Sequence, residues 1–501
     1  MASAFCTLVA GALVLLCFYL YAKFTYWKRH GIPTAKGWYP LVGHVLPVIT
    51  ARKHVFEVIT QACKDNKDCS MIGFYKGCKP VLIIREAELI KSVLQNNFSN
   101  FHDNGLKIEP DADPLLAKNP FFNSGDTWML GRKRLTYAFS NTRLKILFAG
   151  ICGVLKKFEN FLERRLKSNT RYEVELKYLF SKFTAEVVAN AGLGVEGLCF
   201  EDKEHATAFD KIGETVFKPS LIQGILGQLI ILFPGVNSIC KFPFVQKDID
   251  HLFRKIVTEN LEIRRKESTP RNDFIQLMID LEKSGDSLDI ETVASDAFSF
   301  YTDGYETSSA TLNFTGYLLA AYPAVQEKLR NEVKSTIEKH GGELTFESLK
   351  EMTYMDQVIK ESQRYYSVVG FLSKLCTEEF EFKGSDGLSY RATPGSEVYI
   401  PTYAIHRDPK YWTDPDVFDP ERFSDERKQT IEKMAFLPFG EGPRMCVGMR
   451  MALLQIKACL AGLLRSYKLE LSPKTKLPFK FSPTTLVVSP VGGCWVYISK
   501  L

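Results

Sequence analysis

The pattern of hydrophobic and polar residues predicts a mainly helical chain. Over many long segments hydrophobic residues recur every three or four positions, the period of a helix with one buried face. Runs typical of strands are short, such as Val81–Ile84 and Val398–Ile400. Helices are predicted at 54–65, 86–96, 124–139, 144–168, 176–192, 247–267, 290–320, 323–340, 352–366 and 447–466. The expected fold class is mainly α with small β-sheets.

The first hydrophobic segment differs from the others because it has no polar face. Residues 2–22 carry no charge, and as a helix they would be about 31 Å long, enough to cross the hydrocarbon core of a bilayer. Lys23, Lys28 and Arg29 follow directly, and no cleavage site is evident before them. We therefore predict a transmembrane signal anchor, and the positive flank places the C-terminal body in the cytosol.

The remainder of the chain shows no domain boundary. Residues 23–43 are basic and rich in Pro and Gly, which predicts a stiff joint, because proline fixes φ and restricts the residue before it. Beyond this joint no low-complexity stretch or repeat at a fixed interval divides the sequence. We predict a single catalytic domain over residues 44–501.

Composition narrows the possible functions. The 12 cysteines form no CxxC pair, which argues against a zinc ribbon or a small disulfide scaffold and favours reduced thiols. The net charge is +6, from 64 Lys and Arg against 58 Asp and Glu, and no block of basic residues occurs. These values argue against nucleic-acid binding. Docking to an acidic protein remains open.

The run FGEGPRMCVG, Phe439 to Gly448, carries the main candidate chemistry. Glycines around Cys446 let a flat ring approach the backbone, and an adjacent cation, Arg444, favours the thiolate that ligates metal. A free cysteine in a glycine-rich turn is the alternative. The run resembles the haem-binding loop of cytochrome P450 monooxygenases. The resemblance implies a cytochrome P450 fold, haem b as cofactor and Cys446 as the axial ligand, with Phe439 and Arg444 among the cofactor-binding residues.

Two further motifs resemble the same family. Glu361 and Arg364 are three apart on a predicted helix and can form an ion pair, and Arg422 lies in the later run PERF. By resemblance these three residues are structural and hold the Cys446 loop. Trp128 and Arg132 are four apart, and by resemblance they meet a haem propionate, together with Arg444 and Lys374. Lys374 and Asn104 stand where related proteins often carry arginine, so propionate anchoring is expected to differ here.

The helix predicted at 290–320 contains the candidate catalytic residues. By resemblance Thr307 would hydrogen-bond dioxygen, Glu306 would relay protons, and Gly304 would let the helix open beside the oxygen site. Back-bonding of Thr307 to a carbonyl one turn earlier is the structural alternative. Asp303 departs from the small residue, usually alanine, of the family, which leaves substrate orientation and proton supply open.

Two other motifs are read as structural. Gly192–Gly197 satisfies the nucleotide-binding pattern GxGxxG, but it follows a predicted helix and not a strand, so glycine more plausibly ends that helix. NADPH is therefore expected to bind a partner reductase. His406 is read as a packed, hydrogen-bonded residue and not as an iron ligand.

Two surfaces are candidates for contacts with a membrane and with a partner. Phe217–Phe233 is largely apolar and is either core or a second surface that dips into the membrane. Basic residues expected near the cysteine side of the haem would steer an acidic flavoprotein: Arg132, Lys133, Arg134, Arg143, Lys145, Arg450 and Lys457. By resemblance the substrate pocket draws on residues 113–122, Phe300, Thr302, residues 368–372, Thr485 and Leu486.

The resemblance is closest to animal microsomal members, particularly the insect group that handles foreign compounds. It implies that one atom of dioxygen is inserted into a hydrophobic small molecule with electrons from NADPH through cytochrome P450 reductase, and possibly from cytochrome b5. The expected location is the endoplasmic reticulum membrane, with a single span. Two alternatives remain, a peroxide isomerase or dehydratase of the same fold, and a non-enzymatic membrane haem carrier or gas sensor.

Overall fold

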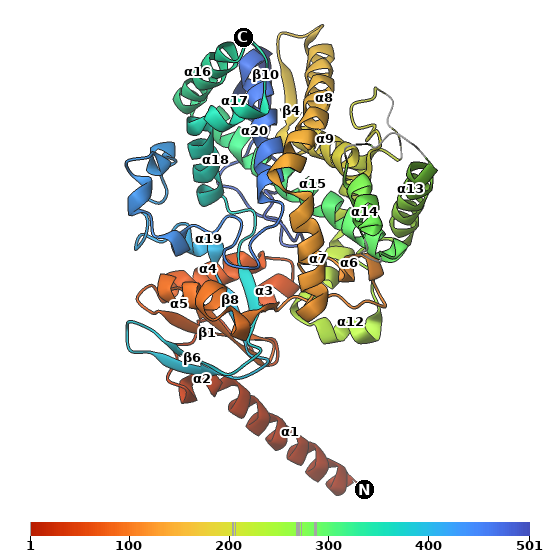
Figure 1. Ribbon diagram of the computed structural model, residues 1–501. Coiled ribbons are helices and arrows are strands. Elements are labelled where there is room, and N and C mark those ends of the chain that lie inside the picture. The colour runs from red at the N-terminus through yellow and green to blue at the C-terminus, as the bar shows by residue number, and fades with distance from the viewer. Residues whose placement is uncertain (1, 203–204, 206, 267–270, 272, 285–287) are drawn as a thin grey trace.

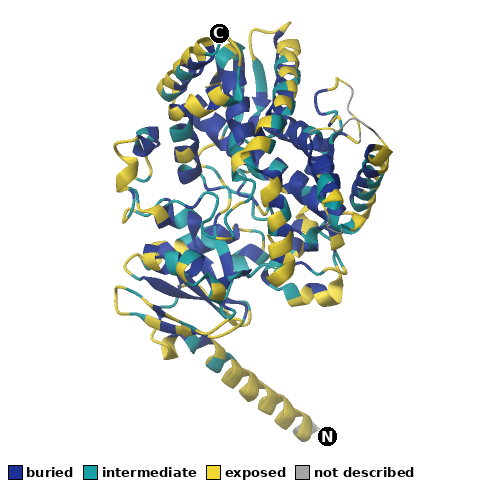
Figure 2. Cartoon of the chain, viewed as in Figure 1, coloured by how far each residue is buried: buried dark blue, intermediate teal, exposed yellow. Residues whose placement is uncertain are grey.

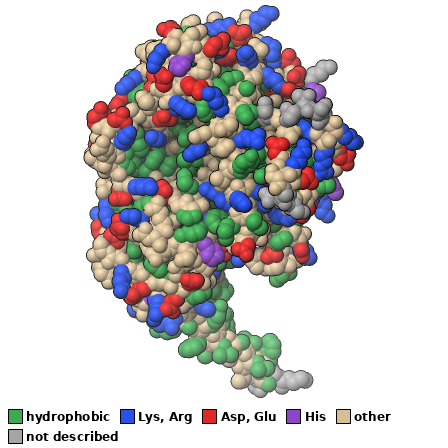
Figure 3. Space-filling model, viewed as in Figure 1, with side chains coloured by type: hydrophobic (Ala, Val, Ile, Leu, Met, Phe, Trp, Pro, Cys, Tyr) green, Lys and Arg blue, Asp and Glu red, His purple; other side chains and the backbone are tan. Residues whose placement is uncertain are grey.

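A computed structural model shows a helical body above a smaller sheet-containing layer, from which the N-terminal helix projects (Figure 1). It describes all residues except 1, 203–204, 206, 267–270, 272 and 285–287. The projecting helix α1 (Ala2–Phe24) is exposed over residues 4–19 and becomes buried only at its base, at Phe24 (Figure 2). Residues Ala4–Phe24 have the length and hydropathy of a membrane span. The space-filling view shows this helix as a mainly hydrophobic arm (Figure 3).

The helices predicted from hydrophobic periodicity are present, with ends shifted by a few residues. The segment predicted as one helix at 86–96 divides into α5 (Ala87–Lys91) and a π-helical turn, η1 (Ser92–Asn96). The predicted helices are α4 (Val55–Asp65), α5 (Ala87–Lys91), α7 (Gly125–Ala138), α8 (Asn141–Leu166), α9 (Leu176–Val188), α13 (Lys247–Lys266), α15 (Ile290–Ala321), α16 (Pro323–Lys339), α18 (Thr353–Tyr365) and α20 (Met449–Ser466).

Other helices had not been predicted, and most of them are short. Four helices of moderate length lie between α9 and α15, where only α13 had been predicted. They are α10 (Phe209–Phe217), α11 (Leu221–Leu232), α12 (Pro234–Cys240) and α14 (Phe274–Lys283). The shortest are α2 (Tyr26–Arg29), α3 (Leu46–Ile49), α6 (Pro114–Ala117), α17 (Phe346–Glu351) and α19 (Thr402–Ile405), with 3₁₀ turns η2 (Phe98–Phe101), η4 (Pro420–Phe423), η5 (Lys428–Thr430) and η6 (Lys433–Ala435).

The strands form small sheets, as expected. The largest has the order β1-β2-β8-β5-β3, where β1 pairs antiparallel with β2, and β2 runs parallel to β8. Both strand-like runs seen in the sequence lie in it, Val81–Ile84 in β2 and Val398–Ile400 in β8. Its strands are β1 (Met71–Lys76), β2 (Lys79–Ile84), β3 (Asp103–Asn104), β5 (Leu372–Leu375) and β8 (Glu397–Ile400). The smaller sheets have the orders β4-β10-β9, formed by Tyr172–Glu175, Trp495–Lys500 and Tyr467–Leu471, and β6-β7, formed by Phe380–Lys383 and Ser389–Ala392.

Helix α15 is the central element of the helical body. Most of its residues are buried, and it packs along α9 and also contacts α13, α18 and α20. The burial map shows the same arrangement, with buried helices around α15 and exposed faces at the periphery (Figure 2). A 32-residue helix that is apolar on most sides but carries Asp296, Asp303 and Glu306 is therefore a core helix and not a membrane span.

The GxGxxG run ends a helix, as the sequence indicated. Helix α9 ends at Val188, a π-helical turn η3 covers Ala189–Leu193, and Gly194 follows in the left-handed conformation with φ of 65°. Glycine adopts this conformation without a steric penalty. A dinucleotide-binding turn requires a strand directly before the glycines. Here helix α9 precedes them, so this requirement is not met.

The joint after α1 is docked on the sheet. Trp27 is 1% exposed, and its indole N–H donates to the Phe74 carbonyl oxygen at 2.9 Å. Its ring lies so close to Gly73 that a Cβ there would come within 2.3 Å of Trp27 Cγ. Phe24, the last residue of α1, stacks on Trp38 at 4.6 Å between ring centroids. The base of the projecting helix is thus fixed to the sheet by aromatic packing.

We expect Trp27→Ala to lower the free energy of unfolding by about 3–5 kcal/mol, because a buried aromatic ring and its hydrogen bond are lost. Thermal unfolding of the detergent-solubilised protein measures the change. The matched control is Trp38→Ala in the same joint, which removes a more exposed ring and is expected to cost about 0.5–1.5 kcal/mol. Equal effects of the two substitutions would contradict the docking of the joint through Trp27.

Candidate functional site

Cys446 lies in a tight loop immediately before α20. Its backbone N–H donates to the Phe439 carbonyl oxygen at 2.8 Å, which closes the loop. Gly440 and Gly442 have φ of 70° and 76°, and a Cβ on Gly442 would lie 1.8 Å from the Leu94 carbonyl oxygen. Glycine at 442 is therefore required both by the backbone conformation and by close packing.

The Cys446 side chain is accessible to a water-sized sphere and yet desolvated. Much of the side-chain surface of Cys446 is exposed. Protein atoms nevertheless surround the sulfur closely enough that desolvation raises the pKa of the thiol to about 11. A side chain that is accessible and also surrounded by protein atoms borders an internal space. Asp303 on α15 combines the same two properties, and its charge also raises the pKa of the Cys446 thiol. The cysteine loop and α15 therefore face a common internal space.

The cation that acts on the sulfur is not the one the sequence indicated. Arg444 points away and binds the Pro120 carbonyl oxygen at 3.2 Å and the Asn123 carbonyl oxygen at 3.0 Å. Arg132 from α7 lowers the pKa of the Cys446 thiol, as do backbone N–H groups of Gly448 and Met449. Burial outweighs these favourable charges. A metal ion would have to supply the remaining stabilisation of the thiolate.

Three cations gather beside this loop with little negative charge to balance them. They are Arg132 from α7, Lys374 from β5 and Arg444. Burial, together with the charge of Arg444, lowers the pKa of Lys374 to about 7, and burial lowers the pKa of Arg444 to about 10. Within the described parts of the chain, the one carboxylate in an ion pair with them is Asp103, 3.3 Å from Arg444. The cluster therefore has more positive than negative charge.

Neighbouring polar groups complete this cation cluster. Lys374 donates to Asn104 Oδ1 at 2.8 Å, and Asn104 donates in turn to the Phe121 carbonyl oxygen at 2.8 Å. The Arg444 guanidinium lies over the Trp128 ring, 4.2 Å from its centroid. The indole N–H of Trp128 makes no hydrogen bond to any residue that the structure describes. The residues predicted to meet the haem propionates are thus brought together, and the missing negative charge fits two carboxylates of haem.

Glu361 and Arg364 form the buried ion pair that their spacing predicts. Arg364 donates to both oxygens of Glu361, at 2.7 and 2.8 Å, and both side chains are fully buried. Arg364 also donates to the carbonyl oxygens of His406, Pro415 and Val417. Arg422 donates to Glu361 at 3.3 Å. This network ties α18 to the segment that leads into the cysteine loop.

His406 is packed, as predicted from the sequence. Its Nε2 accepts the Leu437 backbone N–H at 2.8 Å, so its Nδ1 carries the proton and bonds to Ser367 Oγ at 2.6 Å. Burial lowers its pKa to about 3, which keeps the ring neutral. Both ring nitrogens are occupied, and neither is free to bind iron. The bond to Leu437 links the ion-pair network directly to the residues before Phe439.

On α15, Asp303 and Thr307 share one face. Thr307 Oγ1 donates to the Asp303 carbonyl oxygen at 2.6 Å, which is the back-bonded arrangement expected of threonine inside a helix. Helix α15 is regular through Gly304, and a Cβ there would lie 2.8 Å from Val188 of α9. In this structure the glycine serves close helix packing, and its carbonyl oxygen accepts from Gln455 at 3.1 Å.

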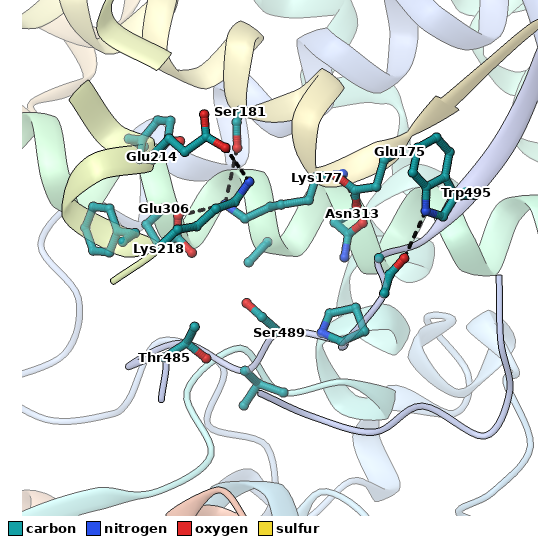
Figure 4. A pocket seen from close by; sticks show the side chains of 17 residues that line it. Glu175, Lys177, Ser181, Glu214, Lys218, Glu306, Asn313, Thr485, Ser489 and Trp495 are labelled. Carbon is teal, nitrogen blue, oxygen red and sulfur yellow. Dashed lines mark hydrogen bonds and ion pairs between the residues drawn. The ribbon is translucent and has the colours of Figure 1, made fainter. Parts of the chain in front are cut away.

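Glu306 points to a different side of α15 from Thr307. Lys177 of α9 binds Glu306 Oε2 at 2.7 Å and Ser309 Oγ at 2.6 Å. Lys177 and Glu306 line a cavity of about 270 Å³, whose other polar lining residues include Glu175, Glu214, Lys218, Asn313 and Thr485 (Figure 4). The close-up shows Lys177 and Glu306 directed toward each other at one side of this cavity. Cys446, Asp303 and Thr307 are not among its lining residues.

Sequence reasoning missed the residues that partner α15. Lys177 lies about 130 positions before its partner Glu306. Asn119 lies about 180 positions before its partner Asp303. Neither belongs to a motif, and no spacing rule connects residues on separate segments. Residues 113–122 had been assigned to the pocket by resemblance, which is the one signal that included Asn119.

The basic face predicted from sequence is largely neutralised by ion pairs. Arg132 faces the interior, where it donates to the Met445 carbonyl oxygen. Lys133 on α7 is exposed, and no ion pair involves it among the described residues. Four of the other predicted cations are paired with carboxylates: Arg134 with Asp296 at 2.7 Å, Arg143 with Asp280 at 3.4 Å, Lys145 with Glu347 at 2.8 Å and Lys457 with Asp356 at 3.0 Å.

Sequence comparisons identify the class of protein to which this fold and site belong. The family model described as Cytochrome P450 matches residues 33–495. Cytochrome P450 6a2 of Drosophila melanogaster is 31% identical, over 97% of both chains. Cytochrome P450 6j1 of Blattella germanica is 30% identical, over 97% of this chain and 96% of its own, and cytochrome P450 6d1 of Musca domestica is 30% identical, over 96% and 97%. The chain belongs to the cytochrome P450 family. It is a monooxygenase whose cofactor is haem.

We expect Arg364→Lys to lower the free energy of unfolding by about 3–5 kcal/mol, because lysine cannot form the fork and leaves Glu361 buried without its full set of partners. The measurements are the thermal midpoint and the haem content of the purified protein. Arg427→Lys is the control, since it alters an exposed ion pair with Asp419, and it is expected to cost less than about 1 kcal/mol. A loss of similar size in both variants would contradict the importance of the buried pair.

Proposed function

We propose that this protein is a membrane-anchored haem-thiolate monooxygenase with Cys446 as the axial ligand. It would insert one oxygen atom into a hydrophobic small molecule, such as a xenobiotic, a lipid, a sterol or a hormone-like compound. The observation that carries the proposal is that a desolvated but accessible thiol faces α15 across an internal space. A buried thiol of high pKa gains most from a bound metal ion, which stabilises its thiolate form.

The residues proposed to hold haem are Trp128, Arg132, Lys374 and Arg444, with Phe439 in the loop. Support comes from the three cations, which have Asp103 as their one ion-paired carboxylate among the described residues, and from the unused Trp128 N–H. Two propionates would raise the lowered pKa of Lys374 and return it to its charged form. When bound, haem supplies the thiolate-ligated iron at which dioxygen is activated.

Thr307, Glu306 and Gly304 are proposed to serve the oxygen site. Thr307 carries a hydroxyl on the face of α15 that borders the internal space, and this hydroxyl can turn from the Asp303 carbonyl to donate outward. Glu306 and Lys177 lie on the side of the polar cavity, where a carboxylate can accept protons from water. Gly304 keeps the distance between α15 and α9 short. In this arrangement Glu306 would take up protons at the cavity, while Thr307 would donate a hydrogen bond at the oxygen site on another face of α15.

The proposed location is the endoplasmic reticulum membrane, with residues 2–22 as the single span and residues 44–501 on the cytosolic side. Helices α11 and α12 support a second membrane contact. Ile222 is 72% exposed and Ile239 is 85% exposed, whereas Ile230 and Leu232 are buried. The apolar run therefore contributes both to core and to surface. In Figure 1, α12 lies on the side of the body from which α1 leaves, so both can meet one bilayer.

The proposed redox partners are NADPH-cytochrome P450 reductase and cytochrome b5. Because most of the predicted basic face is internally paired, electrostatic steering would depend on a small number of exposed charges on α7 and on Arg450 at the start of α20. Substrates would be hydrophobic and would reach the enzyme from the membrane.

The ferrous carbon monoxide spectrum tests the proposal. We expect the wild-type protein and Cys152→Ser, which alters a half-buried thiol on α8, to show the red-shifted Soret band of thiolate ligation. Cys446→Ser should lose this band, because a hydroxyl does not donate electron density as a thiolate does. Retention of the band in Cys446→Ser would contradict the assignment.

Turnover separates this function from the alternatives. Substrate-dependent NADPH consumption with reductase is expected. Conversion of a hydroperoxide without NADPH would instead indicate an isomerase or dehydratase, and ligand binding without NADPH consumption would indicate a haem carrier or sensor.

We expect Lys133→Glu to lower kcat/KM for reductase by about 3–10-fold at low ionic strength, because it reverses an exposed charge beside the cysteine loop. The difference should shrink as salt is added, since screening weakens exposed charges. Lys64→Glu, at the exposed end of α4 in the sheet layer, is the control and should leave reductase kinetics unchanged. A salt-independent defect, or an equal defect in both variants, would count against steering through α7.

A further inference from the structure

Asp303 is an unusual group to find beside the internal space that Cys446 borders. It lies one helical turn before Thr307, on the same face of α15. Its side chain is accessible, yet burial raises its pKa to about 6. At neutral pH the carboxylate is therefore predominantly ionised although protein atoms surround it.

Most other buried carboxylates among the described residues are paired with a cation. Asp296 binds Arg134, Glu306 binds Lys177 and Asp210 binds Lys182, each at 2.7 Å, as do Asp273 and Glu361 with Arg264 and Arg364. Asp113 has no such cation but accepts two backbone N–H groups, from Phe244 and Val245. For Asp303, no ion pair with Lys, Arg or His occurs in the part of the chain that the structure describes. Its negative charge is thus not balanced by the protein.

A neutral amide holds the Asp303 carboxylate in place. Asn119 Nδ2 lies 3.1 Å from one carboxylate oxygen and 3.3 Å from the other. Asn119 is 1% exposed, and its own Oδ1 accepts the Phe121 backbone N–H at 2.7 Å, which fixes the orientation of the amide. Thr302 Oγ1 lies 3.4 Å from the carboxylate. These contacts orient the carboxylate without neutralising it.

We propose that Asp303 binds the positively charged nitrogen of hydrophobic cationic substrates, and that it thereby orients them beside Cys446. The proposal rests on the proposed function, because it assigns a substrate class to that same site. An unpaired charge that protein atoms largely surround is costly, and a cationic ligand removes this cost, whereas a neutral ligand of equal shape does not. The carboxylate lies on the helix face of Thr307, so a bound cation would place adjoining carbon atoms next to the oxygen site.

Asp303 has one competing role, in proton supply. A carboxylate next to Thr307 is also placed to donate a proton during turnover. That role predicts changes in NADPH coupling for every substrate, with no preference for charge at equilibrium. The two roles are therefore separated by binding measurements made without reductase or turnover.

The test compares two ligands that differ in charge but not in shape. A phenylalkyl trimethylammonium ion and its tert-butyl carbon analogue have the same outline, and neither has a free electron pair to bind iron. Dissociation constants are measured on the full-length holoenzyme by haem absorbance and by calorimetry. We expect the wild-type protein to bind the cation at least about tenfold more tightly, a difference of about 1.4 kcal/mol, because the trimethylammonium ion is attracted by the unpaired carboxylate and the carbon analogue is not.

The variants assign this preference to Asp303. Asp303→Asn and Asp303→Ala should abolish the tenfold preference while the affinity for the carbon analogue changes less than about threefold. Asp303→Glu keeps the charge and should keep the preference. Equal affinities of the wild-type protein for both ligands would overturn the proposal, as would a preference that survives in both neutral variants.

The carbon monoxide spectrum keeps this result separate from the proposed function. If the wild-type protein and the variants show the thiolate band, the ligand comparison tests Asp303 alone. If the wild-type protein lacks the band, the proposed function fails first, independently of any charge preference.

Discussion

A buried charge is stable only when a charge of opposite sign or hydrogen bonds compensate it. Around Cys446 the polypeptide leaves buried positive charges without enough carboxylates. Arg132, Lys374 and Arg444 are desolvated with Asp103 as their one ion-paired carboxylate among the described residues, and the Cys446 thiol is held far from its ionised form. Elsewhere in the core, carboxylates are satisfied by cations or by backbone N–H groups. The imbalance is therefore local. The two carboxylates of haem would balance the cations, and its metal ion would stabilise the thiolate.

The scaffold that holds this imbalance is itself a fully satisfied ionic network. Arg364 and Glu361 meet in a two-bond contact, and the remaining donors of Arg364 bind carbonyl oxygens of the segment that precedes the cysteine loop. His406 continues the network to Leu437. Because a buried network tolerates no missing partner, the position of the loop is tied to α18. Rigid support of this kind keeps the uncompensated groups near Cys446 in place.

Helix α15 separates two environments with different chemistry. One face presents Asp303 and Thr307 to the internal space near Cys446, and another presents Glu306 to Lys177 and a polar cavity. Residues adjacent in a helix point about 100° apart, so Glu306 and Thr307 can serve different compartments although they are neighbours in sequence. The unpaired carboxylate of Asp303 gives the internal space a negative charge, which adds selectivity for charge to a pocket otherwise expected to select for hydrophobicity.

The sequence by itself located most of the long helices, the projecting apolar segment and the residues of the main motifs, but α10, α11, α12 and α14 were missed. Hydrophobic periodicity is a local property, and it located α8, α15 and α20 to within a few residues. Motif spacing paired Glu361 with Arg364, because residues three apart on a helix are always neighbours. Motif spacing could not predict that Arg132, and not Arg444, lowers the pKa of the Cys446 thiol. It also could not predict that ion pairs neutralise most of the basic face.

Those outcomes depend on contacts between segments far apart in the chain, such as Lys177 with Glu306 and Asn119 with Asp303. The interaction energy of two charges and the pKa of each group also depend on burial, and burial follows from packing and not from residue type. The sequence thus specified which groups are present, whereas the tertiary structure decided which of them are compensated, because desolvation and pairing are properties of the folded chain as a whole.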